Sequence, residues 1–559
     1  MTTPRSGGQI LVDQLRVHGV DLAFCVPGES YLPVIDALYD VQDRIRLIVC
    51  RQEGGAANMA EAYGKLTGKP GICLVTRGPG ATNASIGAHT AFQDSTPLIL
   101  FIGQVGSDVV EREAFQEIDY RRMFGPMAKW VAQIDRADRI PEMLSHAFHL
   151  AVSGRPGPVV LALPEDMLAQ KTTAPDAARY QRVQAHPSPQ AMQRLGELLA
   201  QSERPLLLLG GGGWSAQACD DMRTFAENNS LPVSSSFRCQ DLIDNRHSNY
   251  VGDVGIGINQ KLAARIKAAD LVLAVGPRLG EMTTSGYTLF DIPRPQRSLV
   301  HVHAGADELG RVYQAELLIN AGMAEFASSA AALPAVDGQR RRGWLAEARA
   351  DYLANITPST MLGDLDMGAV MVWLREHLPR DAILTTGAGN YTAWVHRFYQ
   401  YGGFRTQLGP TSGAMGYGVP SAIAAKLVFP EKTVVSFSGD GCFLMNGQEL
   451  ATAVQHDLRV IFLVVNNGMY GTIRMHQERE FPARVHGTAL RNPDFAALAR
   501  AYGAHGELVT HTAEFIPAWN RALASGTPAL IELRIDPDVI TTRTTLSAIR
   551  AKALKAATT

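Results

Sequence analysis

The amino-acid sequence predicts an α/β protein built from three doubly wound, parallel-sheet domains. Short apolar segments that end in Gly or Pro, such as residues 71–80 and 97–103, alternate with segments of helical spacing, such as residues 54–68. This alternation is typical of parallel sheets with helices on both faces. The chain has 559 residues, too many for one core, and its 52 glycines suit many tight turns between strands and helices.

We place the domains at residues 1–170, 190–335 and 360–535, followed by a tail at 536–559. Polar, Pro-containing stretches separate the three alternating units and are typical of links between domains. The first and third units have similar size and alternation, so we expect related folds. The tail has no obvious role in a core, and we expect it to act as a lid or as an arm across a neighbouring chain.

Composition excludes several classes of function. The formal net charge is −2, so no basic surface for nucleic acid is implied. No apolar run approaches the roughly 20 residues that a membrane-spanning helix needs. The first residues lack the apolar stretch of a signal peptide, so we expect a cytoplasmic protein. The six cysteines show no CxxC spacing, which favours reduced thiols over a zinc site or disulfides.

Two polar clusters stand at the ends of two neighbouring predicted strands. Gly439-Asp440-Gly441 follows the first strand, and Asn467 ends the next one, 27 positions after Asp440. In a βαβ unit both ends lie at the carboxyl edge of the sheet, where open α/β folds bind ligands. Carboxylate and amide oxygens suit Mg²⁺, and the glycines let the backbone approach a phosphate. The sequence therefore predicts a metal–diphosphate site.

This pair of clusters resembles the diphosphate signature of thiamine-diphosphate enzymes. The resemblance implies that Asp440, Asn467 and the main-chain oxygen of Met469 bind Mg²⁺, which in turn holds the cofactor diphosphate. The segment 409–425 resembles the one that places a bulky apolar residue beneath the cofactor, and Met415 occupies that position. The implied cofactor-binding residues are Gly389, Asn390, Tyr391, Met415, Gly439, Asp440, Gly441, Cys442, Asn467, Met469, Tyr470 and Gly471.

The same family requires a glutamate that shares a proton with the pyrimidine ring of the cofactor. Residues 51–83 closely resemble the equivalent region of acetohydroxyacid (acetolactate) synthases, and Glu53 follows a strand there and begins a helix. A partly buried glutamate with a raised pKa suits this role. Because Glu53 and Asp440 reach one cofactor from different chains in this family, the resemblance implies a homodimer at least, and often a tetramer.

Further positions resemble the substrate-facing residues of the same synthases. They are Gly28, Glu29, Phe115, Gln116 and Lys129. The substrate implied is a 2-oxo acid, whose addition to the cofactor leads to decarboxylation and carbon–carbon bond formation.

Two departures from these synthases bear on substrate and cofactor. His476 stands where they carry a Trp that selects the second 2-oxo acid, and Arg278 lacks the acidic pair that follows it in FAD-binding members. FAD in the central domain is therefore uncertain, and ADP remains an alternative there. A Gly-rich segment, residues 210–218, could approach such a nucleotide or form a tight turn.

Alternative functions remain open at this point. Related 2-hydroxyacyl-CoA lyases and oxalyl-CoA decarboxylases share the fold and the glutamate, and they act on acyl-CoA substrates. A nucleotide-dependent oxidoreductase is a distant alternative, because no GxGxxG motif follows a strand in the right context. A catalytically inactive homologue is disfavoured, because Glu53, Met415, Asp440 and Asn467 are all present.

Overall fold

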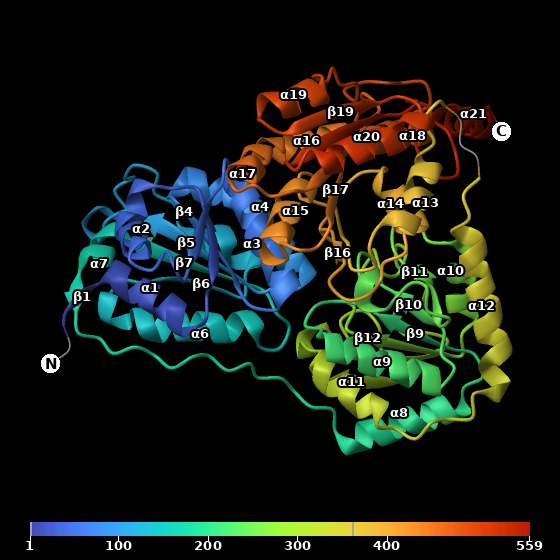
Figure 1. Ribbon diagram of the computed structural model, residues 1–559. Helices are drawn as coiled ribbons and strands as arrows, with labels where there is room; N and C mark the ends of the chain where they lie inside the picture. The colour runs from blue at the N-terminus through green and yellow to red at the C-terminus, as the bar shows by residue number, and fades with distance from the viewer. Residues whose placement is uncertain (1–2, 360–362, 559) are drawn as a thin grey trace.

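A computed structural model describes residues 3–359 and 363–558 of the chain. Three six-stranded sheets, each with all its strands parallel, form three layered α/β units (Figure 1). The fold class predicted from the sequence is confirmed. Within the described residues, no helix is both long and apolar enough to cross a membrane. All six cysteines are free thiols, as predicted.

The first sheet has the strand order β3-β2-β4-β5-β7-β6. Its strands are β2 (Leu22–Cys25), β3 (Arg46–Val49), β4 (Gly71–Val75), β5 (Leu98–Gln104), β6 (Trp130–Gln133) and β7 (Pro158–Pro164). Its helices are α1 (Gly7–Val17), α2 (Leu32–Tyr39), α3 (Glu53–Thr67), α4 (Gly78–Asp94), α5 (Tyr120–Phe124), α6 (Ile140–Val152) and α7 (Glu165–Ala169). Strands β5 and β7 are buried along their whole length, because helices cover both faces.

The third sheet has the strand order β16-β15-β17-β18-β20-β19. Its strands are β15 (Ile383–Thr386), β16 (Gln407–Leu408), β17 (Val434–Gly439), β18 (Ile461–Asn466), β19 (His505–Val509) and β20 (Ala529–Arg534). Its helices are α13 (Met367–His377), α14 (Thr392–Phe398), α15 (Gly418–Val428), α16 (Asp440–Asn446), α17 (Leu450–Gln455), α18 (Gly471–Glu480), α19 (Phe495–Ala501) and α20 (Thr512–Ala524). Counted within each unit, the first and third sheets have the same strand order, so these two units are related folds.

The central sheet has a different order, β11-β10-β9-β12-β13-β14, which is the classic dinucleotide-binding order. Its strands are β9 (Pro205–Leu209), β10 (Val233–Ser235), β11 (Tyr250–Asp253), β12 (Leu271–Val275), β13 (Ser298–His303) and β14 (Leu317–Asn320). Its helices are α8 (Pro189–Gln201), α9 (Ala216–Asn228), α10 (Gln260–Ala268), α11 (Met323–Ala331) and α12 (Arg342–Asn355). An extended link, preceded by the short pairing of β1 (Arg5–Ser6) with β8 (Lys171–Thr172), leads into this unit along the lower edge of Figure 1.

The first and third units share one apolar core. Helix α3 packs against α15, and both helices carry small residues that are fully buried, such as Ala57 and Ala60 on α3 and Ala422 and Ala425 on α15. Small side chains let two helices approach closely and bury backbone as well as side chains. The two units are therefore held in one fixed arrangement within the chain.

The tail does not extend away from the chain. Helix α21 (Leu546–Thr558) packs against α18, and two guanidinium nitrogens of Arg550, Nε and Nη2, donate to the Glu478 carboxylate over 2.8 and 2.5 Å. The described residues of the tail pack against their own chain. An arm across a neighbouring chain stays a prediction. Its position beside α18 fits the alternative expectation of a lid, because α18 borders the cavity described below.

Candidate active site

The ends of β17 and β18 place the predicted metal ligands side by side. The two strands pair with Gly439 opposite Val465, so Asp440 lies next to the turn that follows Asn466. Gly468 has a φ of +68°, a left-handed conformation that glycine adopts readily, and it folds this turn back. Its N–H donates to Oδ2 of Asp440 over 2.9 Å. The β18 turn is thereby fastened to the Asp440 carboxylate.

Asp440 is a buried carboxylate surrounded by donors. Its residue is 3% exposed, and its oxygens accept from Gly441, Gly468 and Asn492. Burial raises the pKa of Asp440 above its ordinary value, while these hydrogen bonds oppose the rise. A cation beside the carboxylate would offset the cost of burying its charge.

All the predicted cofactor-binding residues line one cavity of about 230 Å³ in the third unit. The aromatic rings of Tyr391 and Tyr470 lie against two of its glycines. A Cβ at Gly439 would lie 2.9 Å from Tyr391, and one at Gly441 would lie 2.7 Å from Tyr470. Both positions therefore need glycine for the rings to approach this closely. The structure brings the predicted residues together, although their contact with a cofactor remains a prediction.

The oxygen donors of the cavity fit Mg²⁺ better than a soft metal. Asp440 supplies a carboxylate, Asn467 a side-chain carbonyl, and Met469 a main-chain carbonyl, and all three residues line the cavity. Hard oxygen ligands are those that Mg²⁺ prefers, and it usually takes few protein ligands while bridging to phosphate. Within the described part of the chain, no cluster of three or more His, Cys, Asp or Glu could hold a metal elsewhere.

Some residues of the cavity were missed by sequence reasoning. Val539 and Ile540, from the segment before α21, line it, and the main-chain oxygen of Ile540 accepts from Nδ2 of Asn390 over 3.2 Å. The sequence signal that could have identified Val539 and Ile540 was an apolar pair in an otherwise polar tail. Asn492 was also missed, because it lies in an irregular segment between α18 and α19.

Glu53 begins α3 at the carboxyl edge of the first sheet. The Gln52 side chain caps this helix by accepting from the N–H of Gly55 over 3.1 Å. The Glu53 side chain is half-buried, and its Oε2 accepts from Nδ2 of Asn83 over 2.9 Å. The glutamate is thus held by α4 at the edge that the resemblance predicted.

Three other predicted residues gather near Glu53 at the turn between β4 and α4. A Cβ at Gly28 would meet Thr76, and the main-chain oxygen of Gln116 accepts from the N–H of Gly78 over 2.9 Å. Phe115 is the preceding residue, and it is 75% exposed.

Two predicted residues do not join either group. Lys129 precedes β6, at the amino edge of the sheet, and its Nζ donates to the main-chain oxygen of Ser153 over 2.8 Å. The expectation that Lys129 faces the substrate is wrong, because the carboxyl and amino edges of a parallel sheet lie at opposite ends. His476 lies on α18 beyond the residues that line the cavity, and its Nδ1 faces Arg479 over 3.4 Å.

Within the chain, the residues just before Glu53 contact Glu449. Oε1 of Glu449 accepts from the N–H groups of Arg51 and Gln52, each over 2.9 Å. Glu449 ends the short helical turn η8 (Gly447–Glu449) that follows α16, whereas Asp440 begins α16. At about 1.5 Å per residue, on the order of 10 Å of helix separates Asp440 from Glu449.

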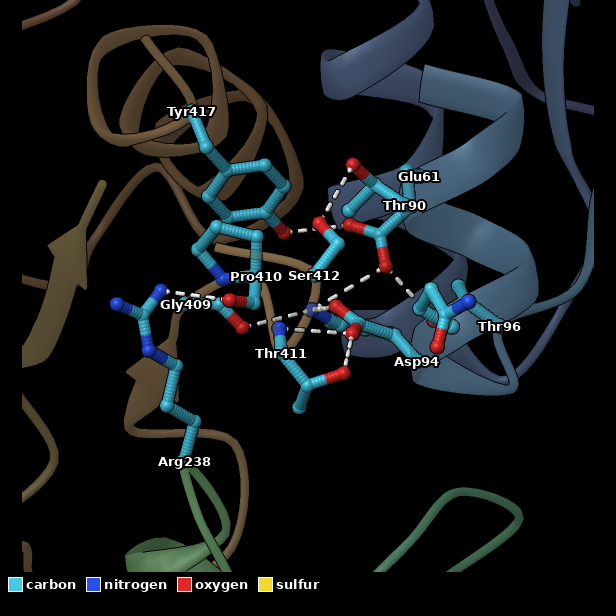
Figure 2. A network of polar contacts seen from close by, with 12 residues as sticks. Glu61, Thr90, Asp94, Thr96, Arg238, Gly409, Pro410, Thr411, Ser412 and Tyr417 are labelled. Carbon is cyan, nitrogen blue, oxygen red and sulfur yellow. Dashed lines mark hydrogen bonds and ion pairs between the residues drawn. The ribbon is translucent and has the colours of Figure 1, made fainter. Parts of the chain in front are cut away.

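A buried polar network joins all three units around residues 409–417, the segment that carries Met415 (Figure 2). From the first unit, Asp94 accepts from the N–H of Thr411 over 2.8 Å, and Glu61 accepts from the hydroxyl of Tyr417. From the central unit, Arg238 donates to the main-chain oxygen of Pro410 over 2.8 Å. Burial raises the pKa of Glu61.

A cation balances the two carboxylates of this network. Lys65 pairs with Asp94 and, over 3.2 Å, with Glu61, and its Nζ also donates to the main-chain oxygen of Gly409 over 3.0 Å. Glu61 and Asp94 are both buried, so neither charge is tolerated without this partner. The Met415 segment is therefore anchored to helices of the first unit rather than held by its own unit alone.

A second cavity, of about 440 Å³, lies where the three units meet. Its basic lining residues are Lys65, Arg182, Arg238, Arg278 and Arg405. The Gly-rich loop after β9 borders it, but a Cβ at Gly211 would lie 2.0 Å from the main-chain oxygen of Gly276, so this glycine is required by contact within the chain. Arg278 itself faces Glu308 over 3.3 Å.

Comparison with known proteins agrees with this arrangement. Three sequence profiles of thiamine pyrophosphate enzymes match the chain: the N-terminal TPP binding domain at residues 5–123, the central domain at 192–329 and the C-terminal TPP binding domain at 387–533. The matches fall on the three units in order, and of the strands in the three sheets only β6, β7 and β15 lie wholly outside the matched residues.

Full-length relatives narrow the family. The chain is 30% identical to the acetolactate synthase large subunit of Corynebacterium glutamicum, covering 95% of this chain and 87% of the relative. It is 31% identical to the acetolactate synthase isozyme 2 large subunit of Escherichia coli K12, over 95% and 96% of the two chains. It is also 31% identical to the probable acetolactate synthase large subunit of Methanocaldococcus jannaschii, over 95% and 92%. With the same three domains and nearly the whole length in common, the chain belongs to the thiamine-pyrophosphate-dependent enzymes of the acetolactate synthase type.

Proposed function

We propose that this enzyme is a Mg²⁺-dependent carboligase and decarboxylase that acts on a small 2-oxo acid. The observation that carries the proposal is that Asp440, Asn467 and Met469 line one cavity together with Gly439 and Gly441. The relatives named acetolactate synthase support the 2-oxo acid as the substrate class.

In this proposal, Asp440, Asn467 and Met469 would hold Mg²⁺, through which the chain would bind the cofactor diphosphate. Bound thiamine diphosphate would provide the nucleophilic carbon and the electron sink that decarboxylation of a 2-oxo acid requires. Met415 lines the cavity and supports the cofactor from below.

Glu53 acts on the cofactor held by a second chain. Within the chain, its helix begins beside Glu449, which lies at the other end of the α16–η8 segment from Asp440. The resemblance to enzymes whose site lies between two chains supports a glutamate from a partner. A homodimer would supply it, and two such dimers would form the tetramer that the resemblance implies.

Substrate contacts are assigned to the residues near Glu53. Gly28, Phe115 and Gln116 of one chain would face the reacting carbon on the cofactor of the other. His476 of α18 would border the second substrate, one to two helical turns from the cavity wall.

For the central cavity we propose an anionic nucleotide, either FAD or an ADP-containing molecule. Nε of Arg238 and Nε of Arg405 are buried there without a hydrogen-bond partner among the described residues, and both residues line the cavity. Buried donors without partners are costly, and phosphate oxygens would satisfy them. Denaturing the purified protein and identifying the released small molecules by absorbance and mass distinguishes FAD from ADP or CoA.

The experiment that tests the function is turnover of a substrate panel. Pyruvate and longer 2-oxo acids, with and without an acceptor aldehyde, would be compared with acyl-CoA thioesters by CO₂ release and product mass. Glu53→Gln should lower turnover at least 100-fold, because general acid–base groups contribute about 10²–10⁴-fold. Glu142→Gln, an exposed change on α6, is the control. Turnover of acyl-CoA thioesters alone, or unchanged turnover in Glu53→Gln, would contradict the proposal.

A further inference from the structure

The side-chain amide of Asn492 bridges the predicted metal ligand and the end of β18. Its Nδ2 donates to Oδ2 of Asp440 over 2.7 Å and to Oδ1 of Asn466 over 2.9 Å. Oδ2 of Asp440 also accepts from the N–H of Gly468, whereas Oδ1 accepts from the N–H of Gly441, each over 2.9 Å. One carboxylate oxygen is therefore engaged by two protein donors from separate segments.

The orientation of this amide follows from its surroundings. With nitrogen and oxygen exchanged, the Asn492 oxygen would face two other oxygens, on Asp440 and Asn466, and both contacts would become repulsive. In the observed orientation Oδ1 of Asn492 is buried and accepts no hydrogen bond from the described residues. Leaving a buried acceptor without a donor is unfavourable, so the two bonds made by Nδ2 determine where the amide lies.

Asn466 is itself fixed from the opposite side. Its Nδ2 donates over 2.8 Å to Oε1 of Glu532, a fully buried residue of β20. Arg534 pairs with the same Glu532 oxygen over 2.9 Å. This pairing holds the Asn466 oxygen toward Asn492, and a continuous series of contacts leads from Arg534 to Asp440.

We propose that Asn492 is a positioning residue for the metal site. By holding Oδ2 of Asp440, it keeps the carboxylate from rotating and leaves Oδ1 as the oxygen available to a divalent cation. Residues that orient a ligand from behind typically change metal affinity 10–100-fold when they are removed. The inference rests on the proposed function, since it assigns Asp440 to Mg²⁺.

The test is a metal titration of cofactor-saturated protein. Asn492→Leu keeps the branched shape but removes the donor, and it also removes the buried acceptor that lacks a partner. We expect the Mg²⁺ midpoint, followed by tryptophan fluorescence, and the affinity for Mn²⁺, followed by electron paramagnetic resonance, to weaken 10–100-fold. Because Oδ2 of Asp440 keeps its bond from Gly468, the metal-free variant should remain folded, and its unfolding temperature checks this. Asn492→Ala should give the same metal shift.

A matched control separates positioning from general stability. Nδ2 of Asn320 in the central unit likewise donates to two oxygens, those of His303 and Ala304, over 2.9 and 3.1 Å. Asn320→Ala should leave the metal midpoint unchanged. An unshifted midpoint in Asn492→Leu, or an equal shift in Asn320→Ala, would overturn the inference. Failure of the unaltered protein to bind Mg²⁺ with the cofactor would instead overturn the proposed function.

Discussion

Oε1 of Glu449 accepts a 2.9 Å hydrogen bond from the N–H of Gln52, the residue before Glu53. This contact fixes the start of α3 at the far end of the α16–η8 segment from Asp440. The proposed function assigns the two halves of the site to different chains, and mixing inactive variants tests this assignment.

Glu53→Gln and Asp440→Ala should each be inactive alone but complement each other. A mixed dimer would contain one intact site and one site with both changes, so refolding the two variants together at equal amounts should restore about a quarter of the unaltered activity. Activity is measured after co-refolding and after simple mixing without exchange. Absence of any recovery, with mixed dimers demonstrated by mass, would place both residues in one chain's site.

Asp94→Asn should loosen the segment that carries Met415. The change weakens the buried pair with Lys65 and the bonds from Thr411, so we expect a loss of about 3 kcal/mol in the free energy of unfolding. Urea denaturation measures it. Glu142→Gln, which removes one partner of an exposed pair with Arg139, should leave the free energy of unfolding almost unchanged. Equal effects of the two changes would show that the network does not fasten the segment.

Arg550→Ala should release helix α21 from α18. Arg550 contacts the fully buried Glu478 carboxylate through two nitrogens, so removing it leaves Glu478 with Arg474 as its remaining cation. Faster hydrogen exchange in residues 546–556, together with faster cofactor release past Val539 and Ile540, is the expected result. Lys552→Ala, at an exposed position of the same helix, serves as the control. Protection of α21 that survives in Arg550→Ala would argue against the lid.

The pairing of Glu478 also predicts a pH dependence. Its hydrogen bonds with Arg550, and the nearby charge of Arg474, lower the pKa of Glu478 from 4.5 to about 2. A carboxyl whose pKa is lowered by folding stabilises the fold above pH 4.5 and loses this contribution as the pH falls from 4.5 toward 2. The stability difference between the unaltered protein and Glu478→Gln should therefore be constant near neutral pH and shrink below pH 4.5. Denaturant midpoints of both proteins, measured from pH 7 to pH 3, test this. A stability difference between them that does not change with pH would contradict the assignment to Glu478.

The strand ends explain why much of the site could be predicted from the sequence. Asp440 and Asn467 stand where polar residues interrupt apolar runs, and parallel strands bring such positions to one edge. Glu53 was found by resemblance rather than by pattern. Lys129 was misplaced because the limits of β6 were not known from the sequence. Without them, the sequence does not show that Lys129 precedes this strand and so lies at the amino edge of the sheet.

Contacts made by irregular segments could not be predicted. Asn492 reaches Asp440 from a stretch without periodicity, and no spacing rule indicates where such a stretch returns to the sheet. The same holds for residues 409–417, whose anchors on Glu61 and Asp94 come from helices more than 300 positions earlier. Buried charges within α3 and α4 were the available signal, but they do not identify their partner.

Calorimetric titration of metal-free, cofactor-free protein with thiamine diphosphate tests the central claim most directly. In the presence of Mg²⁺ we predict saturable binding with one cofactor per chain, and binding at least ten-fold weaker both without Mg²⁺ and in Asp440→Ala. Asp364→Ala, a change of an exposed acid, should bind like the unaltered protein. Equal affinity with and without Mg²⁺, or an Asp440→Ala variant that binds as tightly as the unaltered protein, would contradict the account.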